Sequence, residues 1–407
     1  MSSDTLVIGF PHQTPRFAAP PPLSLYVHIP WCVRKCPYCD FNSHEAQGDI
    51  PEAAYLAALE RDLEAALPQV WGRRVRSIFF GGGTPSLLSA AGLDQLLTLL
   101  RTLLPVEPLA EITLEANPGT FEAEKFRAFR AAGINRLSIG IQSFNPVHLQ
   151  SLGRIHDDTE ARRAVEIALT YFDNVNLDLM YALPQQSLEQ AVADIDCAIG
   201  FGVQHISAYH LTLEPNTLFY AQPPQLPDDD ASAAMQVAIE ERLSSAGFSH
   251  YETSAFAQKH QRCQHNLNYW QFGDYLGIGA GAHSKLTTQD GVLRQMRYKQ
   301  PKAYMAQAQA GQAIQEQHSV PAAELGFEFM MNALRLNAGF PLALFQTHTG
   351  LPLHVIERPL QAAEARGLIQ RDLSRIQPTA LGQRFLNDLL QLFLPEAPSS
   401  AIHRRDD

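Results

Sequence analysis

The stretch SLYVHIPWCVRKCPYCDFNSH, residues 24–44, places Cys32, Cys36 and Cys39 close together directly after a strand-like run. A structural zinc site needs four ligands, usually from two close pairs, and no second pair follows in this chain. A redox dithiol would leave the third cysteine unexplained. Three thiolates from one loop can instead hold three irons of a [4Fe–4S] cluster and leave the fourth iron open. The stretch therefore predicts this cluster, with a small molecule at the open iron that chelates through an amine and a carboxylate, as S-adenosylmethionine does.

The composition is that of a globular protein, with 407 residues, 45% hydrophobic residues and a formal net charge of -11. The acidic balance argues against a nucleic-acid partner, because binding to phosphates needs clustered Lys and Arg. The five cysteines are odd in number, and no secretory signal precedes them, so a disulfide framework is excluded and a reducing cytoplasm is favoured. No apolar run approaches the roughly 18 residues needed for a transmembrane segment. We therefore expect a cytoplasmic protein without a membrane span.

Short β-branched or apolar runs alternate with amphipathic helical segments from residue 24 to about residue 213, which predicts parallel strands joined by helices. The expected strands are SLYVHI (24–29), VRSIFFG (75–81), AEITLEAN (110–117), RLSIGIQ (136–142), NVNLDLMYA (174–182) and HISAYHLTL (205–213). Six such units are too few for a complete eight-fold barrel. The predicted fold is therefore α/β, with a partial (β/α)6 TIM-like barrel whose functional residues gather at the C-terminal ends of the strands.

Changes in composition divide the chain into five segments. Residues 1–22, rich in Pro, Ser and Ala, predict a flexible arm, and residues 23–220 form the barrel. Prolines and consecutive Asp residues then mark a boundary, so 221–300 is expected to hold a linker helix and an irregular stretch rich in Gly, His and aromatic residues. Residues 301–395 predict a smaller, mostly helical, winged-helix-like domain, and 396–407 a tail.

The spacing Cys-x3-Cys-x2-Cys, with Tyr38 directly before the third cysteine, resembles the radical S-adenosylmethionine superfamily. The resemblance implies that the reduced cluster cleaves the sulfonium to give a 5'-deoxyadenosyl radical, while the protein positions the cofactor. The run FFGGGTPS, with Gly82, Gly83 and Thr84, is similar to the glycine motif of that superfamily. There the missing side chains are expected to let the backbone approach the methionyl group.

Several blocks together resemble the oxygen-independent coproporphyrinogen oxidase (HemN) branch over nearly the whole chain: LYVHIPWCVRKCPYC, GGGTPS, EANPGT, RLSIGIQSFN, LGRIHD, LDLMYALPQQ and HLTLEPNT. The resemblance implies a HemN-like C-terminal domain, a cofactor contact for Tyr26 and hydrogen bonds from ribose hydroxyls to Glu115. It also implies that Gln142, Arg154 and Asp178 line the same pocket or a second cofactor or substrate pocket. The alternatives are a core position for Tyr26, a strand-end cap for Gln142 and a surface ion pair for Arg154.

Two features depart from the decarboxylating oxidases of that branch. They have a further cysteine where this chain has Phe41, and a longer N-terminal arm. Both departures, and the motif HNxxYW formed by His265, Asn266, Tyr269 and Trp270, are similar to the sister group, the heme chaperones of the HemW type. That resemblance implies a protein that binds heme and transfers it to heme-accepting proteins, such as membrane respiratory enzymes.

The segment 263–299 has the residue types that a heme site uses. Heme iron takes a His ligand, its macrocycle prefers aromatic walls and its propionates prefer basic groups. We predict His265 as the axial ligand, with His283 as the second candidate; the alternative for either is a hydrogen-bonded histidine, and for His283 a position near the cofactor. Cys36 precedes a proline, as in Cys-Pro heme-binding motifs, but we discount it as a heme ligand because it is expected to bind the cluster.

Two enzymes remain as alternatives to the chaperone. One is coproporphyrinogen III oxidase, a decarboxylating dehydrogenase, against which Phe41 counts. The other is a radical methyltransferase, which a methylated product would identify. The chain is therefore interpreted mainly as a binding and transfer protein on an enzyme's scaffold.

Overall fold

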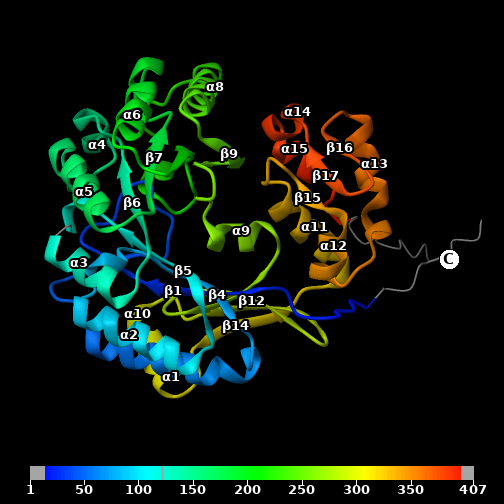
Figure 1. Ribbon diagram of the computed structural model, residues 1–407, viewed down its shortest axis with the longest axis horizontal. Helices are drawn as coiled ribbons and strands as arrows, with labels where there is room; N and C mark the ends of the chain where they lie inside the picture. Colours follow the sequence, from blue (N-terminus) through cyan, green and yellow to red (C-terminus); the bar gives the residue numbers. More distant parts are fainter. Residues whose placement is uncertain (1–13, 121–122, 396–407) are drawn as a thin grey trace, which may run out of the picture.

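A computed structural model of the protein describes residues 14–120 and 123–395. Most of the expected N-terminal arm and all of the expected tail 396–407 lie outside the described residues. The main sheet has twelve strands in the order β14-β13-β12-β11-β1-β4-β5-β6-β7-β8-β10-β9. It curves around the larger lobe on the left of Figure 1, and the C-terminal lobe stands beside it. Among the described helices, none has the length and apolar composition needed to cross a membrane.

The six central strands are parallel neighbours in chain order, which confirms the partial (β/α)6 barrel. They are β1 (Leu23–Ile29), β4 (Val75–Gly82), β5 (Val106–Ala116), β6 (Arg136–Gln142), β7 (Val175–Tyr181) and β8 (His205–His210). Their apolar side chains are almost continuously buried, as expected for parallel strands that are covered by helices. The barrel therefore positions a set of strand ends at one rim.

Helices cover the outer side of these strands (Figure 1). The longer ones are α1 (Glu52–Val70), α2 (Ala90–Leu103), α3 (Ala123–Ala132), α5 (Asp158–Tyr171), α6 (Leu188–Gly200) and α8 (Asp229–Ser245). Shorter ones are η1 (Pro85–Leu87), η2 (Pro118–Thr120), α4 (Pro146–Ser151) and α7 (Leu218–Ala221). Capping boxes begin α5 and α6, where Asp157 pairs with Glu160 and Ser187 with Gln190. These caps fix where each crossover turns into its helix.

The sheet continues beyond the barrel at both edges, which the sequence did not predict. On one side follow β11 (Asp274–Ile278), β12 (His283–Thr288), β13 (Gly291–Arg297) and β14 (Ile314–Ser319), and on the other β10 (Ala255–Ala257) and β9 (Ser249–Glu252). The expected irregular stretch after Cys263 is thus wrong, since α9 (Gln264–Trp270), β11 and β12 occupy it. Glycine is rare in strands, but a Cβ on Gly277 would lie 2.1 Å from the carbonyl oxygen of His283. Close packing, not flexibility, explains that glycine.

The C-terminal lobe has the helix and strand order of a winged helix, as expected. It contains α11 (Ala322–Ala333), β15 (Phe340–Pro341), α12 (Leu342–Thr349), η3 (Leu353–Ile356), α13 (Glu357–Ala365), β16 (Ile369–Arg371), β17 (Arg375–Pro378), α14 (Ala380–Arg384) and α15 (Leu386–Gln391). Its strands form a sheet in the order β15-β17-β16.

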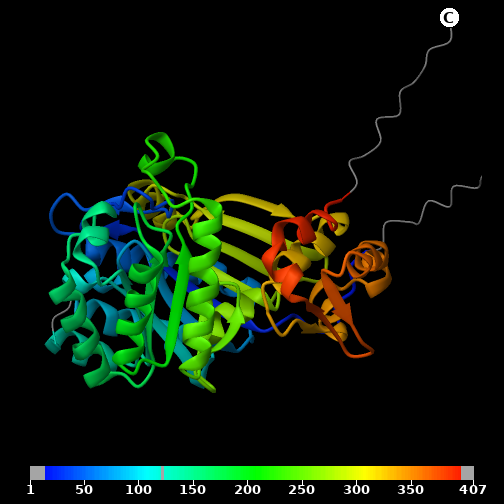
Figure 2. The same ribbon diagram turned by 90° about the horizontal axis from the view of Figure 1, so that it is seen from above.

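Two hydrophobic clusters separate the lobes. The first spans the barrel and reaches Ala313 after α10 (Pro301–Gln309), and the second contains the C-terminal lobe from Val320 onward together with Phe272 and Val292 of the sheet-extension region. Because β11 to β14 belong to the barrel sheet, we propose that residues 221–319 form part of the barrel domain. The C-terminal domain then begins after Ser319 instead of at residue 301. In Figure 2 the strands of this sheet extension, drawn in yellow, reach toward the C-terminal lobe.

Candidate functional site

The loop that carries the three cysteines is closed at its base by a short parallel pair. In this pair β2 (Trp31–Cys32) lies beside β3 (His44–Glu45). The Asn42 side chain donates hydrogen bonds to the carbonyl oxygens of Ala280 and Lys299, both at 2.9 Å. The loop is therefore tied to the sheet extension as well as to β1.

All three cysteines line one cavity of about 360 Å³ at the C-terminal ends of the barrel strands. They are free thiols, and burial raises the pKa of Cys32 and of Cys39. Iron would compensate the charge of the buried thiolates. Within residues 14–120 and 123–395, no three His, Cys, Asp or Glu side chains surround one point closely enough for a single metal ion.

The other predicted site residues line the same cavity, apart from Tyr26 and the two candidate heme ligands His265 and His283. These residues are Tyr38, Gly82, Gly83, Thr84, Glu115, Gln142, Arg154 and Asp178. They come from the C-terminal parts of β4, β5 and β6, from the middle of β7, from the turn after β4, from the loop after α4 and from the cysteine loop. The topology thus brings together residues that the sequence separates widely.

The glycines after β4 are required by the cysteine loop as well. Gly82 has φ +116°, and a Cβ there would lie 2.5 Å from the ring of His28. A Cβ on Gly83 would lie 2.5 Å from the carbonyl oxygen of Trp31. The Gly83 amide donates to Ile29 O at 2.8 Å. The missing side chains therefore let this turn pack directly on the chain that leads into Cys32.

Two carboxyl groups lie deep in the barrel below the cysteines. Glu115 Oε2 accepts a hydrogen bond from the Gly82 amide at 3.1 Å. Burial, with the nearby charge of Asp178, raises the pKa of Glu115 to about 8. Asp178 accepts hydrogen bonds from Ser138 at 2.9 Å and Asn176 at 2.8 Å, and burial raises its pKa too. A ligand that donates hydrogen bonds or carries positive charge would stabilise the ionised form of both carboxyl groups.

Arg154 lies beside the cysteines, so its alternative interpretation as a surface ion pair is wrong. Its Nη1 is 3.5 Å from Cys36 Sγ, and Nη2 donates to the carbonyl oxygen of Gly140 at 2.6 Å and to Asn117. Gln142, at the end of β6, has φ 68° in the left-handed region. Non-glycine residues rarely adopt this conformation, which costs of the order of 1–3 kcal/mol and is concentrated at functional sites.

His265 lies inside the barrel, away from the cysteine cavity. It lies in the first turn of α9, the helix that carries the HNxxYW motif, and is 1% exposed. Its Nδ1 is 3.0 Å from Ser77 Oγ, and its Nε2 is 2.9 Å from Tyr269 OH. Burial lowers the pKa of His265 to about 3. Binding a heme iron at His265 would require one of these hydrogen bonds to break, so its role as axial ligand stays a prediction that this conformation does not favour.

The reason for this burial is that α9 packs inside the barrel, where the His265 amide donates to Glu111 of β5 at 3.1 Å. A cavity of about 170 Å³ inside the barrel is lined by α9 and by residues from all six central strands. His265 packs 5.0 Å from the ring of Phe79 and 6.5 Å from that of Tyr26, measured between centroids. In Figure 1, α9 lies between the barrel and the C-terminal lobe. The HNxxYW motif therefore packs inside the barrel and also faces the neighbouring lobe.

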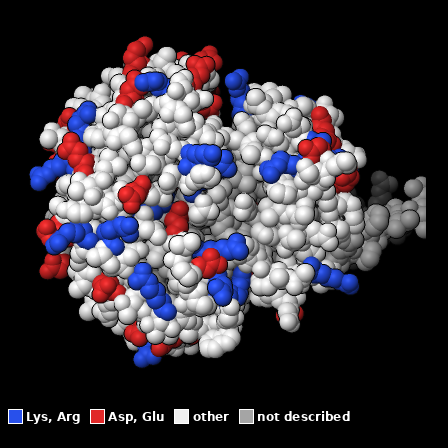
Figure 3. Space-filling view, viewed as in Figure 1, with Lys and Arg blue, Asp and Glu red and all other residues white. Residues whose placement is uncertain are grey.

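A larger cavity of about 730 Å³ lies next to the cysteine cavity. The two share Asp40, Phe41, Ser43, Gly82 and Glu115 as wall residues. The remaining wall contains His28, His44 and His283, the basic residues Lys35, Lys285, Arg294 and Lys299, and the aromatic residues Tyr26, Tyr269, Trp270, Phe272 and Tyr275, with Asn332 from α11. The structure thus places Tyr26 here. On the face in Figure 3 a hollow separates the lobes, and charges of both signs are interspersed.

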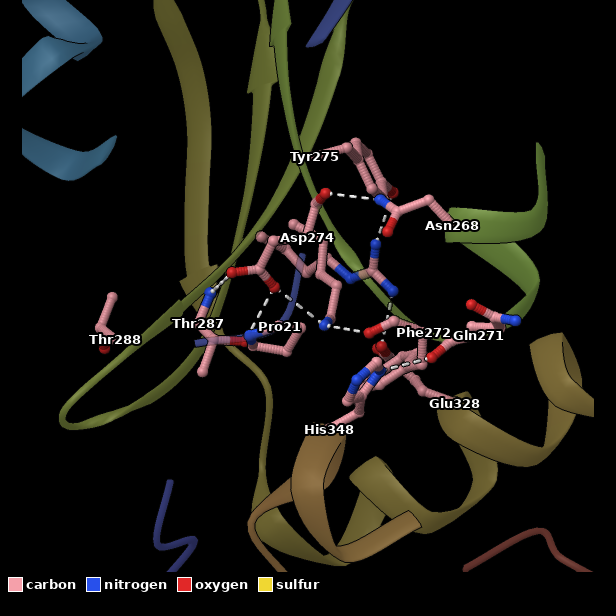
Figure 4. A network of polar contacts seen from close by, with 12 residues as sticks. Pro21, Asn268, Gln271, Phe272, Asp274, Tyr275, Thr287, Thr288, Glu328 and His348 are labelled. Carbon is pink, nitrogen blue, oxygen red and sulfur yellow. Dashed lines mark hydrogen bonds and ion pairs between the residues drawn. The ribbon is translucent and has the colours of Figure 1, made fainter. Parts of the chain in front are cut away.

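A buried polar network supports the wall of this larger cavity (Figure 4). Asp274, which is 0% exposed, accepts hydrogen bonds from Lys285 at 3.0 Å and from both the backbone and the hydroxyl of Thr287 at 2.8 Å. The same carboxylate pairs with Arg73 at 2.8 Å. The Lys285 ammonium also donates to Phe272 O at 2.8 Å and lies 4.0 Å from the centre of the Phe272 ring. This network fixes the turn from α9 into β11.

Contacts from the C-terminal lobe join the same region. His348 Nδ1 lies 2.6 Å from the carbonyl oxygen of Gln271, and Arg294 bridges to Glu328 at 2.7 Å. Arg335 lies 4.2 Å from the centre of the Trp270 ring. The larger cavity therefore has walls from both lobes.

Sequence reasoning missed several residues of the cysteine cavity, among them Asn117, Ser138, Met180 and Tyr209. Asn117 lies in EANPG and Ser138 in RLSIGIQ, so their positions near strand ends were the available signal. Nothing in the sequence pattern separates Tyr209 from an ordinary strand residue.

Comparisons with known proteins agree with this geometry. The family model of the Radical SAM superfamily matches residues 26–198, and that of the HemN C-terminal domain matches residues 320–385. The chain is 49% identical to Heme chaperone HemW of Escherichia coli (strain K12), covering 92% of this chain and 99% of that protein. It is 34% identical to Heme chaperone HemW of Bacillus subtilis (strain 168), with the same two coverages.

Among solved structures, coproporphyrinogen III oxidase (HemN) from Escherichia coli, described as a radical SAM enzyme, has a TM-score of 0.78. It is 25% identical, and the match covers 92% of this chain and 90% of that one. The identity to the curated relatives over almost their whole length shows the family. This chain belongs to the HemW family of radical SAM proteins.

Proposed function

We propose that this protein is a radical SAM heme chaperone, which binds heme and passes it to acceptor proteins. The identity to Heme chaperone HemW of Escherichia coli supports this proposal. The structural observation that carries it is the pair of adjoining cavities, one with three cysteines and one with aromatic, basic and histidine side chains. A planar, dianionic iron macrocycle needs the second combination of groups.

The superfamily implies a [4Fe–4S] cluster and S-adenosylmethionine as cofactors. We propose that Cys32, Cys36 and Cys39 hold the cluster, since they line one cavity as free thiols. When bound, the reduced cluster supplies one-electron chemistry to the sulfonium.

The rest of the cysteine cavity provides the groups for S-adenosylmethionine. Gly82, Gly83 and Thr84 place backbone groups at the cavity wall, and Glu115 and Asp178 provide acceptors for its hydroxyls and its cationic end. Arg154 is positioned to orient Cys36, and Tyr38 and Gln142 line the same wall.

The proposal also concerns the proteins that accept the heme and the cellular compartment in which the protein works. We infer that the acceptors include membrane respiratory enzymes and that the protein works in the cytoplasm, delivering heme to them from that side. The described helices include none that could itself span a membrane, so docking to a membrane acceptor would be through its surface.

Coproporphyrinogen III oxidase is the second candidate, because the HemN structure shares this fold over 90% of its chain. Phe41 argues against it, as this residue replaces the additional cysteine of the oxidases. Phe41 is 59% exposed and lines both cavities, so it stands where a substrate would pass between them.

We expect the reconstituted protein to bind heme in a saturable manner, with about one heme per chain. Titration with heme, followed by the Soret absorbance and the heme content after gel filtration, measures this. Serum albumin and the heme-free buffer serve as references for the spectrum. Heme that is lost completely on gel filtration, from protein with an intact cluster, would contradict the proposal.

A further inference from the structure

The histidines of the larger cavity differ in whether their ring nitrogens are available. Among the described residues, the Nε2 atom of His44 is buried and has no hydrogen-bond partner. His28 has both engaged, with Nδ1 3.0 Å from Tyr26 OH and Nε2 2.9 Å from the carbonyl oxygen of Asn42. In the part of the chain that the structure describes, neither ring nitrogen of His283 has a hydrogen-bond partner. His283 is exposed toward this cavity at the start of β12.

The ring of His283 is placed to bind a metal. It lines the cavity, and a neutral imidazole offers a nitrogen lone pair to a metal ion. Because β12 pairs with β13 through His283 and Met296, the backbone of this histidine is fixed in the sheet.

Basic residues of the same cavity separate into two groups. Lys285 and Arg294 have counter-ions, since Asp274 and Glu328 lie within 3.0 Å and 2.7 Å of them. Lys35 and Lys299 form no ion pair with any described residue; the Lys35 ammonium only donates to two backbone oxygens at 3.3 and 3.4 Å. The cavity wall therefore has two exposed cations without a counter-ion.

These two lysines lie close to one another and to His283. The Asn42 side chain connects the loop of Lys35 to the backbone of Lys299. The positive charge of Lys299 lowers the pKa of His283, and that of Lys35 lowers the pKa of His44. Tyr269 and Trp270 of α9 line the same cavity and provide aromatic surface. One nitrogen ligand, two cations and an aromatic wall are thus gathered in about 730 Å³, a volume in the range of small-molecule sites.

We propose that His283 is the axial ligand of heme in this cavity and that Lys35 and Lys299 bind its two propionates. The inference rests on the proposed heme-binding function and assigns the ligand within it. It also gives the HNxxYW motif a different role, in which Tyr269 and Trp270 form the wall behind the macrocycle and His265 holds α9 in the barrel.

Heme titration of His283→Ala tests the assignment. The expected result is a changed Soret band and affinity weaker by about tenfold or more, with added imidazole restoring the wild-type band. His318→Ala, on an exposed position of β14 outside the cavity, is the matched control and should keep the wild-type spectrum and affinity. Cluster absorbance and circular dichroism of each variant verify that the fold is kept.

The propionate contacts have their own test. Lys35→Gln combined with Lys299→Gln should weaken heme binding by about tenfold while the Soret position stays unchanged, because the iron ligand remains. Lys302→Gln, exposed on α10, is the control. If His283→Ala kept the wild-type spectrum and affinity while His265→Ala lost both, His283 would not be the axial ligand. The proposed chaperone function would then still hold. If the wild-type protein failed to bind heme, both the proposed chaperone function and the assignment of His283 would be refuted.

Discussion

Cys36→Ala should abolish assembly of the cluster. Only three thiols line the cysteine cavity, so the loss of one leaves two protein ligands for the irons. The remaining cysteines cannot replace it: Cys197 Sγ accepts a hydrogen bond from Arg162 at 2.9 Å, and Cys263 is buried beside Glu111. After anaerobic reconstitution, iron and sulfide should fall from about four per chain to well below one, with loss of absorbance near roughly 400 nm.

The control for this experiment is Cys197→Ala, because its thiol lies between α5 and α6, outside the cavity. This variant should keep the iron, the sulfide and the absorbance of the wild type. Full iron and sulfide in Cys36→Ala would contradict the assignment of the three cysteines.

Asp274→Ala should cause the largest loss of stability among single substitutions in the barrel extension. Burial lowers the pKa of Lys285, and Asp274 is the partner that favours its charged form. Removing the carboxylate leaves the 1% exposed Lys285 with only the Phe272 carbonyl and ring. Breaking such a buried pair costs about 3–5 kcal/mol in the free energy of unfolding. Urea unfolding followed by circular dichroism measures the change.

The matched control is Asp196→Ala, which removes an ion pair with Arg242 whose side chains are 47% and 44% exposed. Solvent screening limits that loss to about 0–1 kcal/mol. The double variant Asp274→Leu/Lys285→Met should recover part of the loss, because it removes the buried Lys285 charge, while Arg73 keeps the carbonyl oxygen of Pro21 as an acceptor. Equal effects of Asp274→Ala and Asp196→Ala would show that the buried network does not stabilise the fold.

The cysteine site could be predicted from sequence because its signals are local. The spacing from Cys32 to Cys39 identifies the loop, and the alternation of strands and helices places the Gly82 turn, Glu115 and Asp178 at or near strand ends. Parallel topology then brings these ends to one rim. The predicted residues therefore share a cavity although they lie far apart in sequence.

The position of His265 could not be predicted in the same way. A histidine among aromatic residues is compatible with a ligand site, and only the tertiary structure shows that α9 packs inside the barrel. Likewise, glycines around Gly277 suggest a loop, but β12 packs so closely there that a side chain would not fit. Neither packing relation has a signal in the local sequence.

The wall of the larger cavity is also a property of the tertiary structure. Asn42 of the cysteine loop donates to the carbonyl oxygen of Lys299 after β13, and Trp270 contacts Arg335 of the C-terminal lobe. Such contacts between distant segments depend on the sheet extension, which the sequence did not predict.

The assay that tests the chaperone function most directly offers coproporphyrinogen III to the reconstituted protein, with reductant and S-adenosylmethionine. Chromatography follows the tetrapyrrole and 5'-deoxyadenosine together, in protein whose cluster and heme binding have been verified. The expected result is no protoporphyrinogen, because the protein binds and transfers heme instead of decarboxylating its precursor. Stoichiometric conversion to protoporphyrinogen would contradict the chaperone function and make Phe41 a tolerated replacement in an oxidase.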